Sequence, residues 1–174
     1  MTAPSALEWW QRGPVDGVPA SLQPVAHMLL QMRDEVSAAV RDLPVDAWNA
    51  RPAGVASIAF HVRHIPGVLD RLFTYARGES LNEAQRAALQ REGEPVTDEE
   101  RAILLSELSA RVDTSLAALR AIDAATLNDV RTIGRAQLPS TVLGCLVHGA
   151  EHGMRHLGQV IVTARIVTAR IVAE

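Results

Sequence analysis

Three histidines recur at intervals of four residues near the C-terminus: His148, His152 and His156. On an α-helix each four-residue step turns the side chain by roughly 40° and raises it by about 6 Å, so the three share one face. Two imidazoles with this spacing can bind one metal ion together, as in the helices of zinc proteases. A pair needs a further ligand, and His64 can supply it if its own predicted helix is a neighbour of the last one.

A metal-free interpretation of these histidines stands beside the first. A lone histidine on an apolar helix face is usually a core residue with hydrogen-bonded nitrogens, and this is the interpretation for His27. Burying several imidazoles together leaves many polar atoms to satisfy, whereas one cation takes a nitrogen from each. Spacing alone leaves both the metal site and the metal-free cluster open.

The composition limits the classes of protein that the chain can be. Its 174 residues fit one domain, residues 1–174, and 48% apolar with 21% charged residues is typical of a globular protein and not of a membrane protein. The net charge of -3 argues against nucleic acid as a partner. A single cysteine, Cys145, excludes an internal disulfide and a multi-cysteine zinc site. The N-terminus shows no basic segment before an apolar run, so we expect no signal peptide and a cytoplasmic location.

The apolar pattern and the capping residues predict an all-α fold. Apolar residues from Leu22 to Leu43 alternate steps of three and four, as on one face of a helix. Four further helices are expected, at 57–77 with a kink at Pro66, at 80–92, at 97–121, and from the Pro139-Ser140-Thr141 step to at least Thr163. The sequence therefore predicts a four-helix bundle with a short extra helix between helices two and three, and leaves the topology open.

The last predicted helix has two unusual features. Glycines at 144, 149, 153 and 158 lower its intrinsic helix preference and indicate close packing against another helix or subunit. Its apolar, β-branched end repeats Ile-Val-Thr-Ala-Arg at 161–165 and 166–170, which we interpret as a short tandem duplication. Together they predict a homodimer. Trp9 and Trp10, before the first helix, either cover an end of the bundle or pack against it.

The sequence around the histidines resembles that of a known family. The segments 57–65, Ser-Ile-Ala-Phe-His-Val-Arg-His-Ile, and 151–159, Glu-His-Gly-Met-Arg-His-Leu-Gly-Gln, resemble the two signature stretches of the DinB/YfiT-like superfamily. The resemblance implies a four-helix bundle with one histidine from helix two and a pair from the last long helix, usually around zinc or nickel. Carried over by position, His64 matches the first ligand and His152 and His156 match the pair.

The neighbouring residues leave alternatives open. Pro66 follows His64 by two residues where the resemblance implies a plain helical residue, and His61 lies on a similar face and could exchange roles with His64. His148 is interpreted as a neighbour of the ligands or a core residue. Glu151 is spaced for an ion pair with Arg155, with proton transfer as its alternative. His61, His148 and Glu151 are thus the weak catalytic candidates, while Cys145 is interpreted as a buried small hydrophobe.

Three neutral imidazoles leave a tetrahedral ion with an open position, as expected of a catalytic site. Such an ion can act as a Lewis acid or lower the pKa of a bound water or thiol. The resemblance implies thiol-dependent transfer or isomerisation with a low-molecular-weight thiol, or metal-dependent hydrolysis. The competing interpretations are a non-enzymatic metal-binding stress-response protein with a structural ion, and an interaction module without metal.

Overall fold

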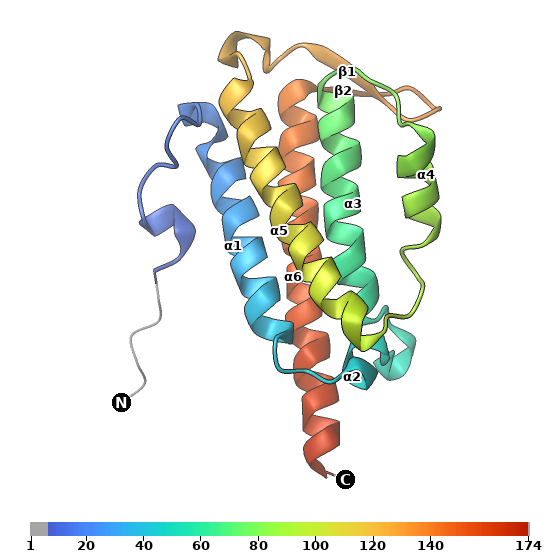
Figure 1. Cartoon of the computed structure of the whole chain (residues 1–174). Coiled ribbons are helices and arrows are strands. Elements are labelled where there is room, and N and C mark those ends of the chain that lie inside the picture. Colours follow the sequence, from blue (N-terminus) through green and yellow to red (C-terminus); the bar gives the residue numbers. More distant parts are fainter. Residues whose placement is uncertain (1–6, 174) are drawn as a thin grey trace.

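The computed structural model describes the backbone of residues 7–173 and the side chains of residues 7–169. This part of the chain is mostly helical and carries one small sheet (Figure 1). Its α-helices are α1 (Gln23–Val40), α2 (Val45–Asn49), α3 (Ile58–Ala76), α4 (Glu83–Gln90), α5 (Asp98–Ala121) and α6 (Val142–Ala173). Its strands are β1 (Val130–Ile133) and β2 (Leu138–Thr141), and short 3-10 turns are found at Trp9–Gln11, Ala20–Leu22, Pro52–Gly54 and Ala124–Thr126.

Capping residues fix the helix ends that matter for the site. The Ser57 hydroxyl accepts a hydrogen bond from the Phe60 amide at the start of α3. Helix α3 continues through Pro66 and ends before Gly78, whose φ of 78° is the left-handed conformation that glycine tolerates. Thr97 and Glu100 form a capping box at the start of α5, the helix predicted at 97–121. Both predicted helices are therefore confirmed to within a residue or two.

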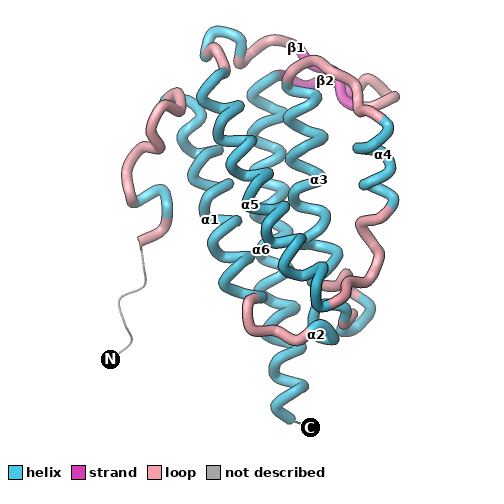
Figure 2. The backbone as a smooth tube through the Cα atoms, in the orientation of Figure 1, coloured by secondary structure: helices cyan, strands magenta, loops and turns pink. Residues whose placement is uncertain are grey.

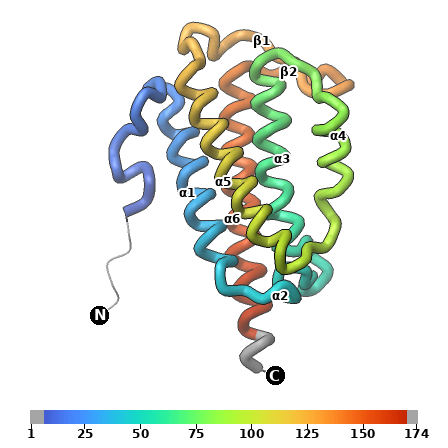
Figure 3. The backbone as a smooth tube through the Cα atoms, viewed as in Figure 1, coloured from blue at the N-terminus to red at the C-terminus, as the bar shows by residue number. Residues whose placement is uncertain are grey.

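The four longest helices, α1, α3, α5 and α6, lie side by side (Figure 1). Helix α6 packs against both α1 and α3, and α5 packs against the same two helices. Helices α3 and α5 run in the same direction, opposite to α1 and α6, because the connection through α4 returns the chain along the outside of α3 (Figure 3). This long connection explains why an alternating up-and-down order does not apply.

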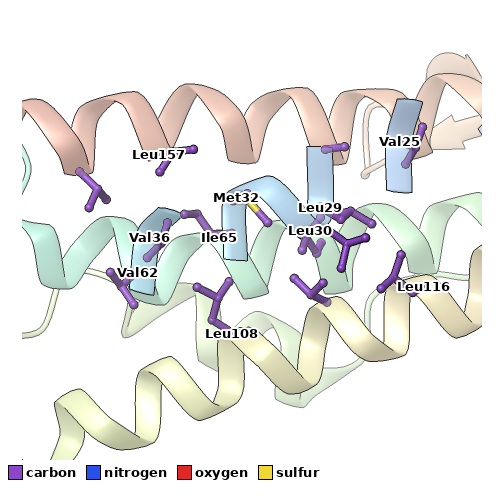
Figure 4. Close-up of a cluster of buried hydrophobic side chains, with 14 of the residues drawn as sticks. Val25, Leu29, Leu30, Met32, Val36, Val62, Ile65, Leu108, Leu116 and Leu157 are labelled. Carbon is purple, nitrogen blue, oxygen red and sulfur yellow. The ribbon is translucent and has the colours of Figure 1, made fainter. Parts of the chain in front are cut away.

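The core lies between these four helices. Figure 4 shows side chains of α1, α3, α5 and α6 meeting between these helices, among them Leu29, Met32, Ile65, Leu108 and Leu157. All five are buried. Gly153 lets α6 approach α1, because a Cβ there would overlap the sulfur of Met32, whereas a Cβ at Gly149 would make ordinary contacts with Leu69 and Leu72. Both glycines thus pack against helices of the same chain.

Three local expectations were wrong. The segment between the predicted helices at 97–121 and from 139 onward, where no element was expected, forms a hairpin, β1 paired antiparallel with β2, at one end of the long helices (Figure 2). The predicted opening of the last helix at 139–141 belongs to β2, and α6 begins at Val142. The short helix begins at Glu83 and not at residue 80, because Asn82 and Gln85 form the capping box.

Helix α6 is longer than its predicted minimum. It continues through both copies of the repeat and extends beyond the neighbouring helices (Figure 1). The repeat is therefore helical and adds length to α6 without starting a new element. Among the described residues, no helix is long and apolar enough to cross a membrane.

Candidate metal centre

His64, His152 and His156 come together where α3 packs against α6. One nitrogen from each ring lies within 4.8 Å of the others. The Nε2 atom of His152 is 3.1 Å from Nε2 of His64 and 3.0 Å from Nε2 of His156. All three side chains are partly buried. The condition set by the sequence, that the helix of His64 is a neighbour of the last helix, is met.

His61 lies one turn before His64 but faces a different atom. Its Nδ1 is 2.8 Å from Nδ1 of His156, on the side of that ring away from the three Nε2 atoms. His61 is 2% exposed and lies outside the group of nitrogens that could share an ion. Phe60 separates the environments of the two α3 histidines, since its ring stacks on His64 and meets His61 edge-on. The geometry therefore gives His61 a contact with His156 and favours His64 over His61 in the cluster.

The other nitrogen of His64 contacts a carboxylate from the turn after α4. The Oε2 atom of Glu92 is 2.6 Å from His64 Nδ1, and its Oε1 accepts a hydrogen bond from Nη1 of Arg71 at 2.8 Å. Burial raises the pKa of Glu92, but hydrogen bonds from His64 and Arg71 outweigh burial and leave the pKa below its ordinary value. Glu92 is therefore an ionised acceptor beside the cluster. Sequence reasoning missed it, because it lies on a turn and carries no spacing signal.

The cluster disfavours protonated histidine. Burial, followed by the nearby His64 ring, lowers the pKa of His61 to about 4. Burial, followed by the neighbouring histidines, lowers the pKa of His156 to about 3. Burial also lowers the pKa of His152. These imidazoles are neutral at pH 7, which is the form that binds a metal ion.

His148 and Glu151 lie at the exposed edge of the cluster. His148 is exposed, so a core position for it was wrong, and its Nδ1 is 3.5 Å from Oε2 of Glu151. Its ring centroid is 5.4 Å from that of His152. Glu151 pairs with Arg155 at 2.7 Å, as its spacing predicted. Neither His148 nor Glu151 belongs to the group of three nitrogens.

Three further sequence interpretations can be checked. Cys145 is fully buried, and burial raises its thiol pKa, so the interpretation as a small hydrophobe is confirmed. His27 is only partly buried and contacts the carbonyl of Gly13. Trp9 packs on the side of α1, where its indole N–H donates to Asp34, and Trp10 is exposed. Of the two alternatives for Trp9, these contacts support packing against α1.

The donor set fits a divalent transition metal. Three Nε2 atoms converge, and any of them that carries no proton directs a lone pair at its neighbours. Lone pairs that face one another repel, and a cation between the rings removes this repulsion by accepting each lone pair as a ligand. Neutral imidazoles suit zinc and nickel, and a carboxylate on the second ring nitrogen is the usual companion of a metal-bound histidine.

Comparison with known proteins supports this fold. A search of curated proteins finds no match to the sequence. A crystal structure of a conserved protein from Enterococcus faecalis is similar, with a TM-score of 0.70 and 20% identity over 85% of this chain and 97% of that chain. Residues 28–160, which include all three histidines of the cluster, match the sequence model of the DinB superfamily. This match covers well over half of the sequence, and the chain belongs to the DinB superfamily.

Proposed function

We propose that this DinB-superfamily protein binds one divalent transition metal, zinc or nickel, through His64, His152 and His156. The observation that carries the proposal is the convergence of one nitrogen from each of these residues within 4.8 Å. We assign the chain, residues 1–174, to a single DinB/YfiT-like four-helix-bundle domain. Two of its packed helices, α3 and α6, carry the three histidine rings.

We further propose that the centre serves a metal-dependent enzyme of the thiol-dependent transferase or isomerase type, or a hydrolase. Three neutral ligands leave the ion its full charge and one open position, which favours an incoming thiolate or other anion. When bound, the ion supplies Lewis acidity and lowers the pKa of a coordinated water or thiol. His152 Nδ1 is 3.2 Å from Nη2 of Arg155, which pairs with Glu151 and is exposed, and this contact with an exposed residue supports access from the surface on the α6 side.

The alternative is a non-enzymatic metal-binding protein in which the ion ties α3 to α6. The cluster lies between α3 and α6, the two helices that pack most extensively, and this position favours a structural role for the ion. The two functions differ at the open position, because a structural ion is closed by a fourth protein ligand and a catalytic one exchanges small ligands.

Metal analysis of purified protein tests the site. We expect about one ion per chain after reconstitution with zinc or nickel, and loss of tight binding in His152→Ala and His156→Ala. His148→Ala is the matched control, since it removes an imidazole from the same helix one turn earlier but outside the cluster. A wild-type protein that takes up neither metal would remove the proposal.

Cobalt substitution tests the enzyme form. Tetrahedral cobalt has visible absorption bands that respond to a change of ligand, so titration with low-molecular-weight thiols and simple anions should change the spectrum. A spectrum that responds to none of them indicates a closed site and favours the structural ion.

We also propose that the protein is a cytoplasmic homodimer without nucleic-acid or membrane partners. The groove between α1 and α6, lined by Ala38, Ala39, Ile161 and Ala164, supports self-association, as do the exposed Val162 and Ile166. Sedimentation at micromolar concentration measures this directly.

A further inference from the structure

Glu92 contacts a row of residues on one face of α3. His64, Gly67 and Arg71 are spaced i, i+3 and i+7, so they follow one another on the same side of the helix. The carboxylate of Glu92 lies over this row and reaches His64 with one oxygen and Arg71 with the other. Glu92 is only 5% exposed, which is rare for a glutamate without a specific role.

Gly67 makes room for this carboxylate. A Cβ at position 67 would lie 2.8 Å from Oε1 of Glu92 and 2.9 Å from Nη1 of Arg71, closer than side chains approach one another. Glycine is disfavoured inside a helix. It occurs here where the Cβ of any other residue would displace the Glu92–Arg71 contact. The helix surface is therefore shaped to accept the Glu92–Arg71 pair.

The turn that carries Glu92 is fixed on both sides. Arg63 of α3, the residue before His64, donates to the carbonyls of Arg91 and Glu94. Arg63 and Arg71 thus hold the turn at residues 91–94 from either side of Gly67. The short helix α4 and its following turn bring a carboxylate to His64 that α3 and α6 themselves do not supply.

The chemistry of this contact decides which nitrogen of His64 is free. An ionised carboxylate only accepts hydrogen bonds, so His64 must carry its proton on Nδ1 to satisfy Glu92. In the neutral ring this leaves the lone pair on Nε2, the atom that faces His152.

We propose that Glu92 is a positioning residue of the metal centre: it holds His64 in the tautomer whose Nε2 lone pair faces the ion, and strengthens that nitrogen as a ligand. The inference rests on the proposed metal-binding function. It also assigns Gly67 and Arg71 to the centre, as the residues that let the carboxylate lie over α3 and hold it there.

The competing role for Glu92 is purely structural, a buried ion pair that fastens the turn after α4 to α3. Three variants separate the roles. Glu92→Gln keeps an acceptor for His64 but loses the charge. The double variant Glu92→Leu/Arg71→Met removes both ions, so no buried charge is left unpaired. Gly67→Ala pushes the Glu92 carboxylate away from the α3 surface and leaves it chemically intact. Its control is Gly93→Ala, in the turn that carries Glu92, because a Cβ at position 93 meets nothing within 4 Å.

The tautomer is read in the metal-free protein by long-range ¹H–¹⁵N NMR of the histidine rings at about pH 8, where an ordinary histidine is neutral. We expect His64 as the Nδ1–H tautomer in the wild type, Glu92→Gln and Gly93→Ala, and a shift toward Nε2–H in the double variant. Nε2–H in the wild type would overturn the inference without reference to any metal.

Competition with a zinc chelator then measures affinity. Removing a carboxylate partner of a metal-bound histidine weakens binding about 10- to 100-fold, so we expect a loss of this size in the double variant. Smaller losses are expected in Glu92→Gln and Gly67→Ala, and none in Gly93→Ala. Circular dichroism checks that each variant is folded.

The outcomes separate the two proposals. If wild type and the folded double variant bind zinc equally well, the role of Glu92 is overturned and the metal site stands. If the wild type binds no zinc or nickel, the proposed function fails and the role of Glu92 with it.

Discussion

The close approach of α6 to α1 can be tested at Gly153, which lies between His152 and His156 of the cluster. A Cβ at this position would contact the sulfur of Met32 and would also lie 3.8 Å from Cγ2 of Ile65. Met32 and Ile65 are both fully buried, so neither can move aside into solvent. Gly158, five residues later on the same helix, is exposed and has open space around its own Cβ position.

The magnitudes follow from two opposing effects in the Gly153→Ala variant. Alanine in place of glycine inside a helix stabilises by about 1 kcal/mol. Overpacking a core costs about 1–3 kcal/mol. We therefore expect Gly153→Ala to change the free energy of unfolding by between about 0 and 2 kcal/mol in the destabilising direction. Gly158→Ala has only the first effect and should stabilise by about 1 kcal/mol.

Urea unfolding of the metal-free protein measures both variants, and a double-mutant cycle identifies the contact. In a Met32→Ala background the obstructing side chain is gone, so Gly153→Ala should become stabilising. If Gly153→Ala and Gly158→Ala stabilise the protein equally in the wild-type background, the close packing of α6 against α1 is refuted.

Further predictions concern acid stability, the thiol and self-association. The free energy of unfolding of the metal-free protein should fall as the pH is lowered from about 6.5. His61 has a pKa of about 4 in the folded protein, so in this pH range it takes up its proton only on unfolding. This one group contributes a slope of at most about 1.4 kcal/mol per pH unit. Equilibrium unfolding at pH 7, 6 and 5 checks this, and a flat profile contradicts it. Cys145 should react with a thiol reagent only in denaturant, because it is fully buried and burial raises its pKa; rapid labelling of native protein would show the opposite. Ile166→Asp should shift a dimer toward monomer in sedimentation velocity by placing a charge on the exposed apolar end of α6, whereas an unchanged dimer would locate the interface elsewhere.

The elements that could be predicted are those with strong local signals. The apolar spacing from Leu22 to Leu43 predicts α1, and Ser57 and Thr97 mark the starts of α3 and α5 by hydrogen bonds within one turn. The hairpin gave no such signal, because its two four-residue strands contain no buried residue and β2 contains Pro139. Its place is set by a distant contact, a hydrogen bond from Arg131 to the carbonyl of Ala76 at the end of α3.

The candidate site divides in the same way. The pairing of His152 with His156 follows from helix geometry alone. The choice between His61 and His64 does not, because both lie on similar faces of α3 and only the position of α6 separates them. Glu92 is 28 residues from His64 in sequence and reaches it only because the connection through α4 folds back along α3. A carboxylate placed by such a connection has no periodic pattern that a single sequence could reveal.

The duplicated end of α6 has a consequence for its rotational register. Five residues advance an α-helix by about 7.5 Å and about 140° around its axis, so the second copy of Ile-Val-Thr-Ala-Arg presents its side chains in different directions from the first. Val162 is accordingly 55% exposed, whereas Val167, the same residue of the next copy, is 5% exposed. Identical pentapeptides thus occupy unlike environments, and a change tolerated in one copy need not be tolerated in the other. The two copies therefore bury different positions of the same pentapeptide, Thr163 and Ala164 in the first and Val167 in the second.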